Sequence, residues 1–297
     1  MRQHKLALCK DHYLEWIPEQ TGRFIEKYKM LTHEEKVLVA VSGGKDSLSL
    51  WDILHRLGYL ADGLYICLGI DNQNPTPGKT LNYSVESQRL AEKFAAARGL
   101  KLHIVDIQNE YGATIPEFAR KSQRGRGKPC SVCGLVKRHV MNRVSRDLGY
   151  DVLATGHNLD DEAAVLFGNT LTWAGEYLVR QGPVLQEIPG LARKVKPLCR
   201  IYEREMLAYA LLRGIEYIYD ECPFSIGSTS IYYKQILNKL ESDRPGAKLS
   251  FYLSFLDAQT SGLFADRKVL QAELHLCPNC GQPTSAPGSC AFCRMMN

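Results

Sequence analysis

Residues 37–47 read VLVAVSGGKDS, an apolar run that passes directly into a short polar loop. The apolar part predicts a buried strand at residues 36–41, and the pattern after the loop predicts a helix. The two glycines allow a tight turn and let a ligand approach the backbone closely. The helix then presents free N–H groups and a partial positive charge at its N-terminus. The loop therefore predicts a phosphate-binding site, to which Lys45 and the hydroxyls of Ser42 and Ser47 add hydrogen-bond donors.

The rest of the chain alternates between strand and helix patterns. Further strands are predicted at residues 63–70, 102–105 and 151–155, with an edge strand at 215–218, and helices at residues 13–30, 46–57, 84–98, 134–148, 160–167, 200–213, 228–240 and 247–263. Residues 71–78 are predicted to form a loop, and residues 108–129 an irregular segment with one short helix. This alternation predicts an α/β fold, a doubly wound parallel sheet with helices on both faces. Ligands of such sheets bind at the carboxyl ends of the strands, where the loops after the first and fourth strands both lie.

Composition sets wider bounds on the protein. The chain has 297 residues, of which 45% are hydrophobic, enough for one sizeable core with small appendages. A formal net charge of +5 permits an anionic partner without requiring one, although basic residues gather within residues 120–128 and 137–146. No apolar run is long enough to span a bilayer, and no apolar signal core follows the basic start. We therefore expect a cytoplasmic protein with no membrane partner.

A second loop, TGHNLDDE at residues 155–162, follows the fourth predicted strand. Gly156 permits close approach of a ligand, and the three acidic residues fall in the first turn of a helix, where carboxylates interact favourably with the helix dipole. Capping alone accounts for Asp160 and Glu162. A carboxylate at this edge of the sheet can also bind the Mg²⁺ that accompanies nucleotide phosphates, or accept a proton. His157 either contacts the substrate or braces the loop.

Ten cysteines include three C-x-x-C pairs, and a reducing cytosol argues against disulfides. Two of the pairs lie close together near the C-terminus, Cys277 with Cys280 and Cys290 with Cys293. Four thiolates at this spacing are typical of a structural, tetrahedral Zn²⁺ site. Such a site has no open coordination position, so we expect a role in folding or docking.

The third pair, Cys130 and Cys133, precedes a predicted helix beside the basic stretch. Alone it is typical of a redox pair, but if Cys222 folds back to join it, three thiolates converge and leave one coordination position of a metal centre open. Whether such a centre is iron–sulfur or zinc does not follow from the spacing. We interpret Cys67, inside an apolar run, and Cys199 as structural.

Several motifs together carry a family resemblance. The string SGGKDS between a strand and a helix resembles the PP-loop of ATP pyrophosphatases, which cleave ATP between the α and β phosphates. CSVC at residues 130–133, GHNLDDEAAVLFGN at 156–169 and the later Cys222-Pro223 resemble the tRNA thiolation enzymes, and above all the tRNA-5-methyluridine(54) 2-sulfurtransferases of thermophiles. The C-terminal cysteine pairs are similar to those of that branch, and the resemblance covers nearly the whole chain.

The resemblance implies four parts of the chain and a set of site residues. Residues 1–30 would form an N-terminal helix with half of a zinc finger, 31–220 a PP-loop catalytic domain of the adenine nucleotide α-hydrolase type, 221–268 a helical region of that domain, and 269–297 a C-terminal zinc finger. ATP would bind to Ala40, Val41, Ser42, Gly43, Gly44, Lys45, Asp46, Ser47, Ile66, Lys137, Gly156 and His157. Cys130, Cys133 and Cys222 would hold a [4Fe–4S] cluster with one open iron, and Lys137 and the catalytic carboxylate Asp161 would act beside them.

The reaction that the resemblance implies is ATP-dependent tRNA thiolation, with Mg²⁺ accompanying the nucleotide. The O2 oxygen of a tRNA uridine, expected at position 54, would attack the α-phosphate and release pyrophosphate. Sulfide on the open iron would then attack C2 and expel AMP. The implied sulfur donor is a thiocarboxylated ubiquitin-like protein or free sulfide, and the implied assembly is a homodimer. Alternatives are thiolation at U34 or C32, a PP-loop ligase or amidotransferase with purely structural cysteines, and a tRNA-binding zinc protein with a vestigial nucleotide site.

Two segments depart from the family pattern. Residues 6–14 match the second half of a family zinc finger, in which Cys9 and His12 supply only two ligands of a partial zinc site. We expect either a degenerate finger or a chain recorded from a downstream start. Residues 71–82 resemble an insertion whose role the sequence does not explain.

Overall fold

A computed structural model describes residues 4–71, 82–122, 124, 129–225, 227–263 and 274–296. At its centre is a six-stranded sheet in the order β3-β2-β1-β4-β6-β5. The strands are β1 (Val37–Val41), β2 (Ala61–Cys67), β3 (Leu102–Asp106), β4 (Val152–Thr155), β5 (Val184–Leu185) and β6 (Arg193–Val195). All neighbours are parallel except β5, which runs antiparallel to β6. The predicted doubly wound α/β fold is confirmed.

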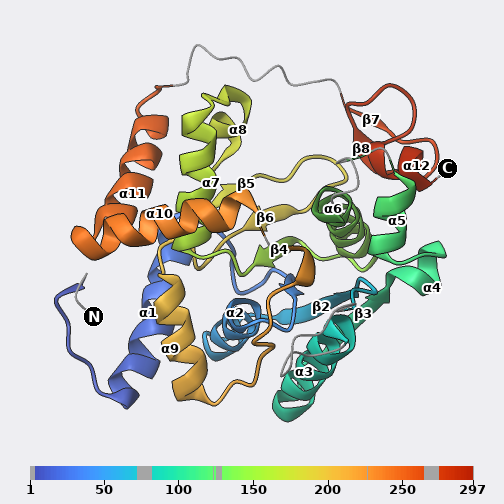
Figure 1. The fold of residues 1–297 in the computed structure, drawn as a ribbon. Helices are drawn as coiled ribbons and strands as arrows, with labels where there is room; N and C mark the ends of the chain where they lie inside the picture. Colours follow the sequence, from blue (N-terminus) through green and yellow to red (C-terminus); the bar gives the residue numbers. More distant parts are fainter. Residues whose placement is uncertain are drawn as a thin grey trace.

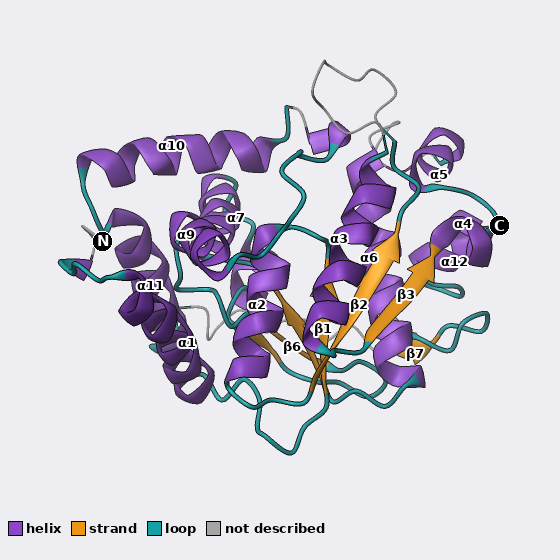
Figure 2. Cartoon of the chain, turned by 90° about the horizontal axis from the view of Figure 1, so that it is seen from below, coloured by secondary structure: helices purple, strands orange, loops and turns teal. Residues whose placement is uncertain are grey.

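Helices cover both faces of the sheet, as Figures 1 and 2 show. They are α1 (Lys10–Lys27), α2 (Lys45–Arg56), α3 (Tyr83–Arg98), α4 (Ile107–Tyr111), α5 (Ile115–Lys121), α6 (Pro129–Asp147), α7 (Leu159–Leu171), α8 (Gly175–Arg180), α9 (Glu203–Arg213), α10 (Thr229–Asp243) and α11 (Ala247–Thr260). Successive residues of a strand face opposite sides of the sheet. Val37, Val39 and Val41 therefore share one core with α1, α2, α3 and α9, whereas Leu38 shares another with α5 and α6.

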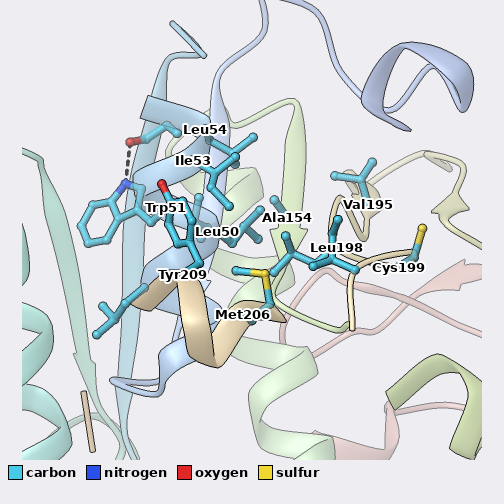
Figure 3. Close-up of a cluster of buried hydrophobic side chains, with 14 of the residues drawn as sticks. Leu50, Trp51, Ile53, Leu54, Ala154, Val195, Leu198, Cys199, Met206 and Tyr209 are labelled. Atoms are coloured by element: carbon cyan, nitrogen blue, oxygen red, sulfur yellow. Dashed lines mark hydrogen bonds between the residues drawn. The ribbon is translucent and has the colours of Figure 1, made fainter. Parts of the chain in front are cut away.

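The larger core lies between the sheet, α2 and α9. Figure 3 shows Leu50 and Ile53 of α2 near Ala154 of β4, with Tyr209 of α9 beside them. Trp51 is fully buried, and its indole N–H donates to the carbonyl oxygen of Ala61 at 2.9 Å. This packing fixes α2, and with it the loop that joins α2 to β1.

Three predictions about elements are wrong. Residues 215–218 form no edge strand; instead the N–H of Ile218 donates to the carbonyl oxygen of Gly43 at 2.9 Å, and the sheet ends at the short strands β6 and β5. Helix α6 begins at Pro129, so Cys130 and Cys133 lie in its first turn instead of preceding it. The segment 108–129 contains most of α4 and all of α5, because Thr114 and Glu117 form a capping box at the start of α5. The loop predicted at residues 71–78 and the insertion-like segment fall outside the described residues from position 72 to 81.

The described C-terminal residues form a small unit against α6, composed of β7 (His275–Leu276), β8 (Pro283–Thr284) and α12 (Ala291–Met296). The Phe292 ring stacks on His139 of α6 with centroids 3.5 Å apart, and the Gln282 side chain donates to the His139 carbonyl oxygen at 3.0 Å. The guanidinium of Arg146 donates to the Cys280 carbonyl oxygen at 3.3 Å. Among the described residues no helix combines the length and the hydropathy that crossing a bilayer requires.

Candidate functional site

The loop between β1 and α2 has the geometry of a phosphate-binding loop. The backbone N–H of Ser42 donates to Oγ of Ser47 at 3.1 Å, and this hydroxyl donates to the Gly44 carbonyl oxygen at 3.0 Å. Gly44 directly precedes α2, and no side chain caps this helix within the described structure. The first N–H groups of α2 are therefore available to an anion. Gly43 has φ +75°, and a Cβ there would lie 2.4 Å from the Ser87 carbonyl oxygen, so only glycine fits.

A pocket of about 100 Å³ opens beside this loop. Its lining comes from the ends of β1 and β2 and from α3 and α6: Ala40, Val41, Ser42, Leu64, Tyr65, Ile66, Leu68, Tyr83, Ser84, Ser87, Lys137 and Met141. The residues assigned to ATP from three separate segments of the sequence thus meet in one place, Ser42 in the loop, Ile66 at the end of β2 and Lys137 on α6. The apolar floor with serines and a lysine at its rim suits a nucleotide base.

The loop after β4 lies directly against the phosphate loop. A Cβ at Gly156 would lie 2.9 Å from the backbone nitrogen of Ser47, so the two loops are in contact where strand order reverses beside β1 and β4. Asn158 and Asp161 form a capping box at the start of α7, with hydrogen bonds of 3.0 and 3.1 Å. Nδ1 of His157 lies 2.8 Å from the Thr155 hydroxyl, which agrees with the bracing alternative.

Two lysines and three carboxylates form a chain of ion pairs beside the phosphate loop. Lys45 Nζ lies 3.0 Å from Asp46 Oδ2 and 2.8 Å from Glu203 Oε1. Lys234 Nζ lies 2.6 Å from Asp161 Oδ1 and 3.1 Å from Glu203 Oε2. Sequence reasoning missed Glu203 and Lys234, because each lies in a helix with no motif around it. The chain joins α2, α7, α9 and α10 at the site.

Burial and neighbouring charges have opposite effects on the pKa values of the groups in this cluster. Burial raises the pKa of Asp46, Lys45 opposes that shift, and Asp161 adds to it. Burial alone would lower the pKa of Lys234, but Asp161 and Glu203 outweigh burial and hold it above its usual value. Oδ1 of Asp46 is buried and has no hydrogen-bond partner in the part of the chain that the structure describes. A buried carboxylate oxygen without a partner, beside a phosphate loop, fits the oxygen ligands that Mg²⁺ prefers.

Asp160 and Glu162 are buried cross-links between elements. Asp160 accepts from the Glu203 N–H at 2.8 Å and pairs with the ammonium of Lys248. Glu162 pairs with Lys196 at 2.7 Å. These contacts occupy both carboxylates structurally, although by joining α7 to other segments and not by capping α7 itself. They leave Asp161 as the carboxylate of this turn that faces the ion-pair cluster.

Three cysteine thiols gather at the first turn of α6. The thiols of Cys130 and Cys133 both influence the pKa of Cys222, which burial raises first, so the three lie near one another. Cys130 Sγ lies 3.3 Å from the carbonyl oxygen of Phe224, in the 3₁₀ helix η3 (Pro223–Ser225) that follows Cys222. Burial raises the pKa of Cys133, whereas Lys137 lowers it. Lys137 also lines the pocket beside the phosphate loop, so the thiols and this pocket share a residue.

The four C-terminal cysteines, Cys277, Cys280, Cys290 and Cys293, are arranged for a single ion. Their sulfur atoms all lie within 4.8 Å of one another, and those of Cys280 and Cys290 are 3.7 Å apart. A tetrahedral ion with Zn–S bonds of about 2.3 Å separates its sulfur ligands by about 3.8 Å. Within the described residues no other group of three or more ligand atoms is this compact. Cys130, Cys133 and Cys222 do not form a group as compact as this, so their thiols are not arranged around a single ion.

Cys9 and His12 lie together at the start of α1. Cys9 Sγ is 3.2 Å from Nδ1 of His12, and the pair is exposed. The described residues add no third ligand to this pair, and residues 1–3 lie outside the described part of the chain. The partial zinc site stays a prediction.

Comparison with known proteins gives a consistent family. The model of the tRNA methyl transferase HUP domain matches residues 35–171. The tRNA-5-methyluridine(54) 2-sulfurtransferases of Thermus thermophilus and Pyrococcus horikoshii are 51% and 42% identical to this chain, covering 99% and 98% of it and 87% of each relative. The solved structure of the U34-tRNA thiolase NcsA from Methanococcus maripaludis with its [4Fe-4S] cluster matches with a TM-score of 0.74 at 25% identity, over 99% of this chain and 90% of that one. The phosphate loop, the thiols beside it and the relatives at this identity lead to one conclusion: the chain belongs to the tRNA-5-methyluridine(54) 2-sulfurtransferase family of tRNA thiolation enzymes.

Proposed function

We propose that this protein is an ATP-dependent tRNA sulfurtransferase that adenylates the O2 oxygen of a tRNA uridine and replaces that oxygen with sulfur. The observation that carries the proposal is the position of Lys137. This residue lines the nucleotide pocket, and its ammonium opposes the rise that burial causes in the pKa of the Cys133 thiol, so the two sites meet in the N-terminal half of α6. In a ligase with purely structural cysteines, nothing would require the cysteines to lie beside the nucleotide pocket.

The residues of the phosphate loop would bind and orient ATP. The free N–H groups at the start of α2 would hold its phosphates, with Lys45 and Lys234 neutralising charge as pyrophosphate leaves. Asp46 Oδ1 would be a ligand of Mg²⁺. Asp161, which pairs with Lys234 at 2.6 Å, would lie beside the reacting phosphates, where it would accept a proton or orient the attacking oxygen.

The two sets of cysteines would hold different metal centres. A [4Fe–4S] cluster held by Cys130, Cys133 and Cys222 would supply one open iron, the chemistry needed to bind sulfide. This agrees with the cluster named for the solved thiolase. The 3.7 Å sulfur separation at the C-terminal site supports a structural Zn²⁺ there.

The names of the relatives bear on the tRNA position. The names of the relatives at 51%, 42% and 40% identity favour position 54, whereas the solved thiolase acts on U34. We take position 54 as the proposal and U34 as the second candidate. The sulfur donor would be a thiocarboxylated ubiquitin-like protein or free sulfide, and the enzyme would act as a homodimer in the cytoplasm.

The decisive experiment is anaerobic. The protein is reconstituted with iron and sulfide, then incubated with ATP, Mg²⁺, sulfide and unmodified tRNA, and the nucleosides are analysed by mass spectrometry. We expect a 2-thiouridine-type base at position 54, formed only with ATP. Mapping the thiolated base separates position 54 from position 34.

Cysteine variants test the cluster in the same assay. Cys222→Ala is expected to abolish thiolation while leaving ATP binding intact, because Cys222 is outside the nucleotide pocket. Cys9→Ala, at an exposed cysteine near the chain's start, is the matched control and is expected to retain activity. Full thiolation by Cys222→Ala would show that the three thiols hold no essential centre.

A further inference from the structure

Three cations lie together beside the thiols without carboxylate partners. Arg138 is on α6, Arg180 is the last residue of α8, and Lys194 is in β6. None of the three makes an ion pair within the residues that the structure describes, although most of the ion pairs elsewhere bridge separate elements. Lys194 lies opposite Leu153 of β4 in the sheet register, and Leu153 is in the core that α6 covers, so Lys194 faces α6 and Arg138. Arg138 and Arg180 both act electrostatically on Lys194, so the three charges form one positive cluster.

The cations are close enough to disturb one another. Burial, and then Arg138 and Arg180, lower the pKa of Lys194 to about 8. Burial, and then Arg124, lower the pKa of Arg138. Like charges held together and partly desolvated destabilise the free protein, and an anionic ligand removes this repulsion. The cluster thus favours a partner with several negative charges.

The position of Arg138 ties the cluster to the reaction site. A Cβ added at Gly134 would lie 3.2 Å from an Nη atom of Arg138, so the guanidinium lies over Gly134, one turn back along α6. Gly134 directly follows Cys133, and the Cys133 thiol acts on the pKa of Arg138. A polyanion on this cluster would therefore pass close to the thiols.

Two exposed aromatic residues lie in or just before α8, the helix that ends at Arg180. Trp173 is 75% exposed and Tyr177, an electrostatic neighbour of Arg138, is 68% exposed. Trp173 has φ +48°, at the end of α7 where the Ala174 N–H donates to the Asn169 carbonyl oxygen at 2.9 Å. Glycine is the usual residue in this left-handed position, since a side chain there is strained. The fold thus exposes a large aromatic ring to solvent at a position where glycine would make the protein more stable.

We propose that Arg138, Trp173, Tyr177, Arg180 and Lys194 form a docking surface for the unpaired RNA loop that carries the target base. Phosphates of that loop contact the three cations, and bases beside the target stack on the two rings. Cationic grooves with exposed aromatic side chains are typical of surfaces that bind single-stranded nucleic acid. An acidic protein would match the charge but would not need the exposed rings. The proposal rests on tRNA being the substrate, as proposed above.

The first test is tRNA affinity of the holoenzyme measured by filter binding at several salt concentrations. Trp173→Ala and Tyr177→Ala are each expected to raise Kd about tenfold, since base–aromatic stacking at this strength is usual. Arg180→Gln and Lys194→Gln are expected to raise Kd and each to lower the slope of log K against log salt by about 0.7, the value for one single-strand phosphate contact. Matched controls are Tyr232→Ala, an exposed tyrosine of α10, and Lys101→Gln, an exposed lysine before β3. Unchanged affinity in all four surface variants would overturn the proposal.

Trp173→Gly separates binding from folding. If the ring serves RNA, this variant melts at a higher temperature than the wild type, because glycine relieves the left-handed strain, yet binds tRNA more weakly. A lower melting temperature with unchanged tRNA affinity would mean that Trp173 is structural and would overturn the assignment.

Competition and turnover distinguish this proposal from the proposed function. An unstructured RNA oligonucleotide is expected to compete with tRNA better than an RNA duplex of equal length. If instead the cation variants bind tRNA normally but lose binding of an acidic ubiquitin-like protein, the surface belongs to a protein and the RNA proposal fails. If the wild-type enzyme thiolates no base, the proposed function fails, while the affinities of the variants still decide whether this surface binds RNA.

Discussion

Gly43 is the residue of the phosphate loop with the least freedom to change. Its φ of +75° and the 2.4 Å separation between an added Cβ and the Ser87 carbonyl oxygen act together. The chain turns here between the end of β1 and the start of α2. A side chain would have to displace α3 or the loop itself.

Gly43→Ala is therefore expected to destabilise the protein by at least about 1 kcal/mol and to abolish ATP binding, as measured by urea unfolding and calorimetry. Gly99→Ala is the matched control, because Gly99 has φ +64° but nothing within 4 Å of an added Cβ. Gly99→Ala should be destabilised only by backbone strain, without a steric clash, and should bind ATP normally. Wild-type ATP affinity in Gly43→Ala would contradict the assignment of this loop.

Lys234 is a second test at the level of single residues. Lys234→Gln would leave Asp161 and Glu203 with one cation fewer beside the phosphates, so we expect ATP to bind at least about tenfold more weakly. Lys239→Gln, an exposed lysine of the same helix, should leave ATP affinity unchanged. Isothermal titration with ATP and Mg²⁺ measures both. Equal affinities for the two variants would show that Lys234 does not act at the site.

Most of the site residues proposed from the sequence belong to motifs. Ser42, Gly156 and Cys222 lie in short strings whose chemistry is local, so the sequence alone suggests roles for them, and these roles stay predictions. Glu203 and Lys234 reach the site only because α9 and α10 pack beside α7, and helix patterns alone do not say which neighbour a polar face will meet. Such residues can be found from the sequence only where a charged side chain interrupts an otherwise apolar face of a helix.

At the scale of elements, Asp52 joins three helices. This fully buried carboxylate of α2 pairs with Arg98 of α3 and Arg213 of α9, and accepts from the Tyr209 hydroxyl at 2.7 Å. Burial alone would raise the pKa of Asp52, but Tyr209, Arg213 and Arg98 outweigh burial and hold it below 3.8. The network holds α2 in place behind the phosphate loop.

Asp52→Asn is expected to destabilise the protein by about 3 kcal/mol, because two arginines lose their charged partner. Since the folded pKa is lowered, the stabilisation by Asp52 is complete above pH 3.8 and is lost as the pH falls through the folded value. The difference in unfolding free energy between wild type and variant should therefore shrink only in strong acid. Urea unfolding at several pH values measures it, and a difference that vanished near pH 6 would contradict the network.

Strong periodic patterns predicted most elements correctly, and short elements were missed. β1, α2 and α3 are near their predicted positions because each has a long apolar pattern or a glycine boundary. β5 and β6 have two and three residues, too few for a pattern, and form because β4 offers an open edge. Ile215 and Ile218 have the composition of a strand, but both are buried against neighbouring elements while the Ile218 N–H bonds to the phosphate loop.

At the scale of the whole molecule, the C-terminal unit supports the helix that carries two of the three thiols. Its Phe292 ring and Gln282 amide both contact α6 at His139, two turns after Cys133. If the C-terminal cysteines hold the proposed Zn²⁺, its removal should loosen the unit, and with it α6.

Cys280→Ala is expected to lose one zinc per chain by elemental analysis and to show faster amide hydrogen exchange across the C-terminal half of α6. Cys9→Ala should keep that zinc and the same exchange rates. Slow exchange in α6 after loss of the zinc would show that the helix holds its position without the C-terminal unit.

The hydrogen bond from Ile218 to Gly43 limits how far Cys222 can lie from the phosphate loop. Cys222 follows Ile218 by four residues, and four residues extend at most about 14 Å, so the third thiol is tethered to the phosphate loop. Ordering of that loop by nucleotide would restrict the freedom of Cys222, and fixing Cys222 in a cluster would restrict the loop in return. Bound nucleotide would therefore slow the release of Cys222 from the cluster, whereas loss of the iron would remove none of the groups that line the nucleotide pocket.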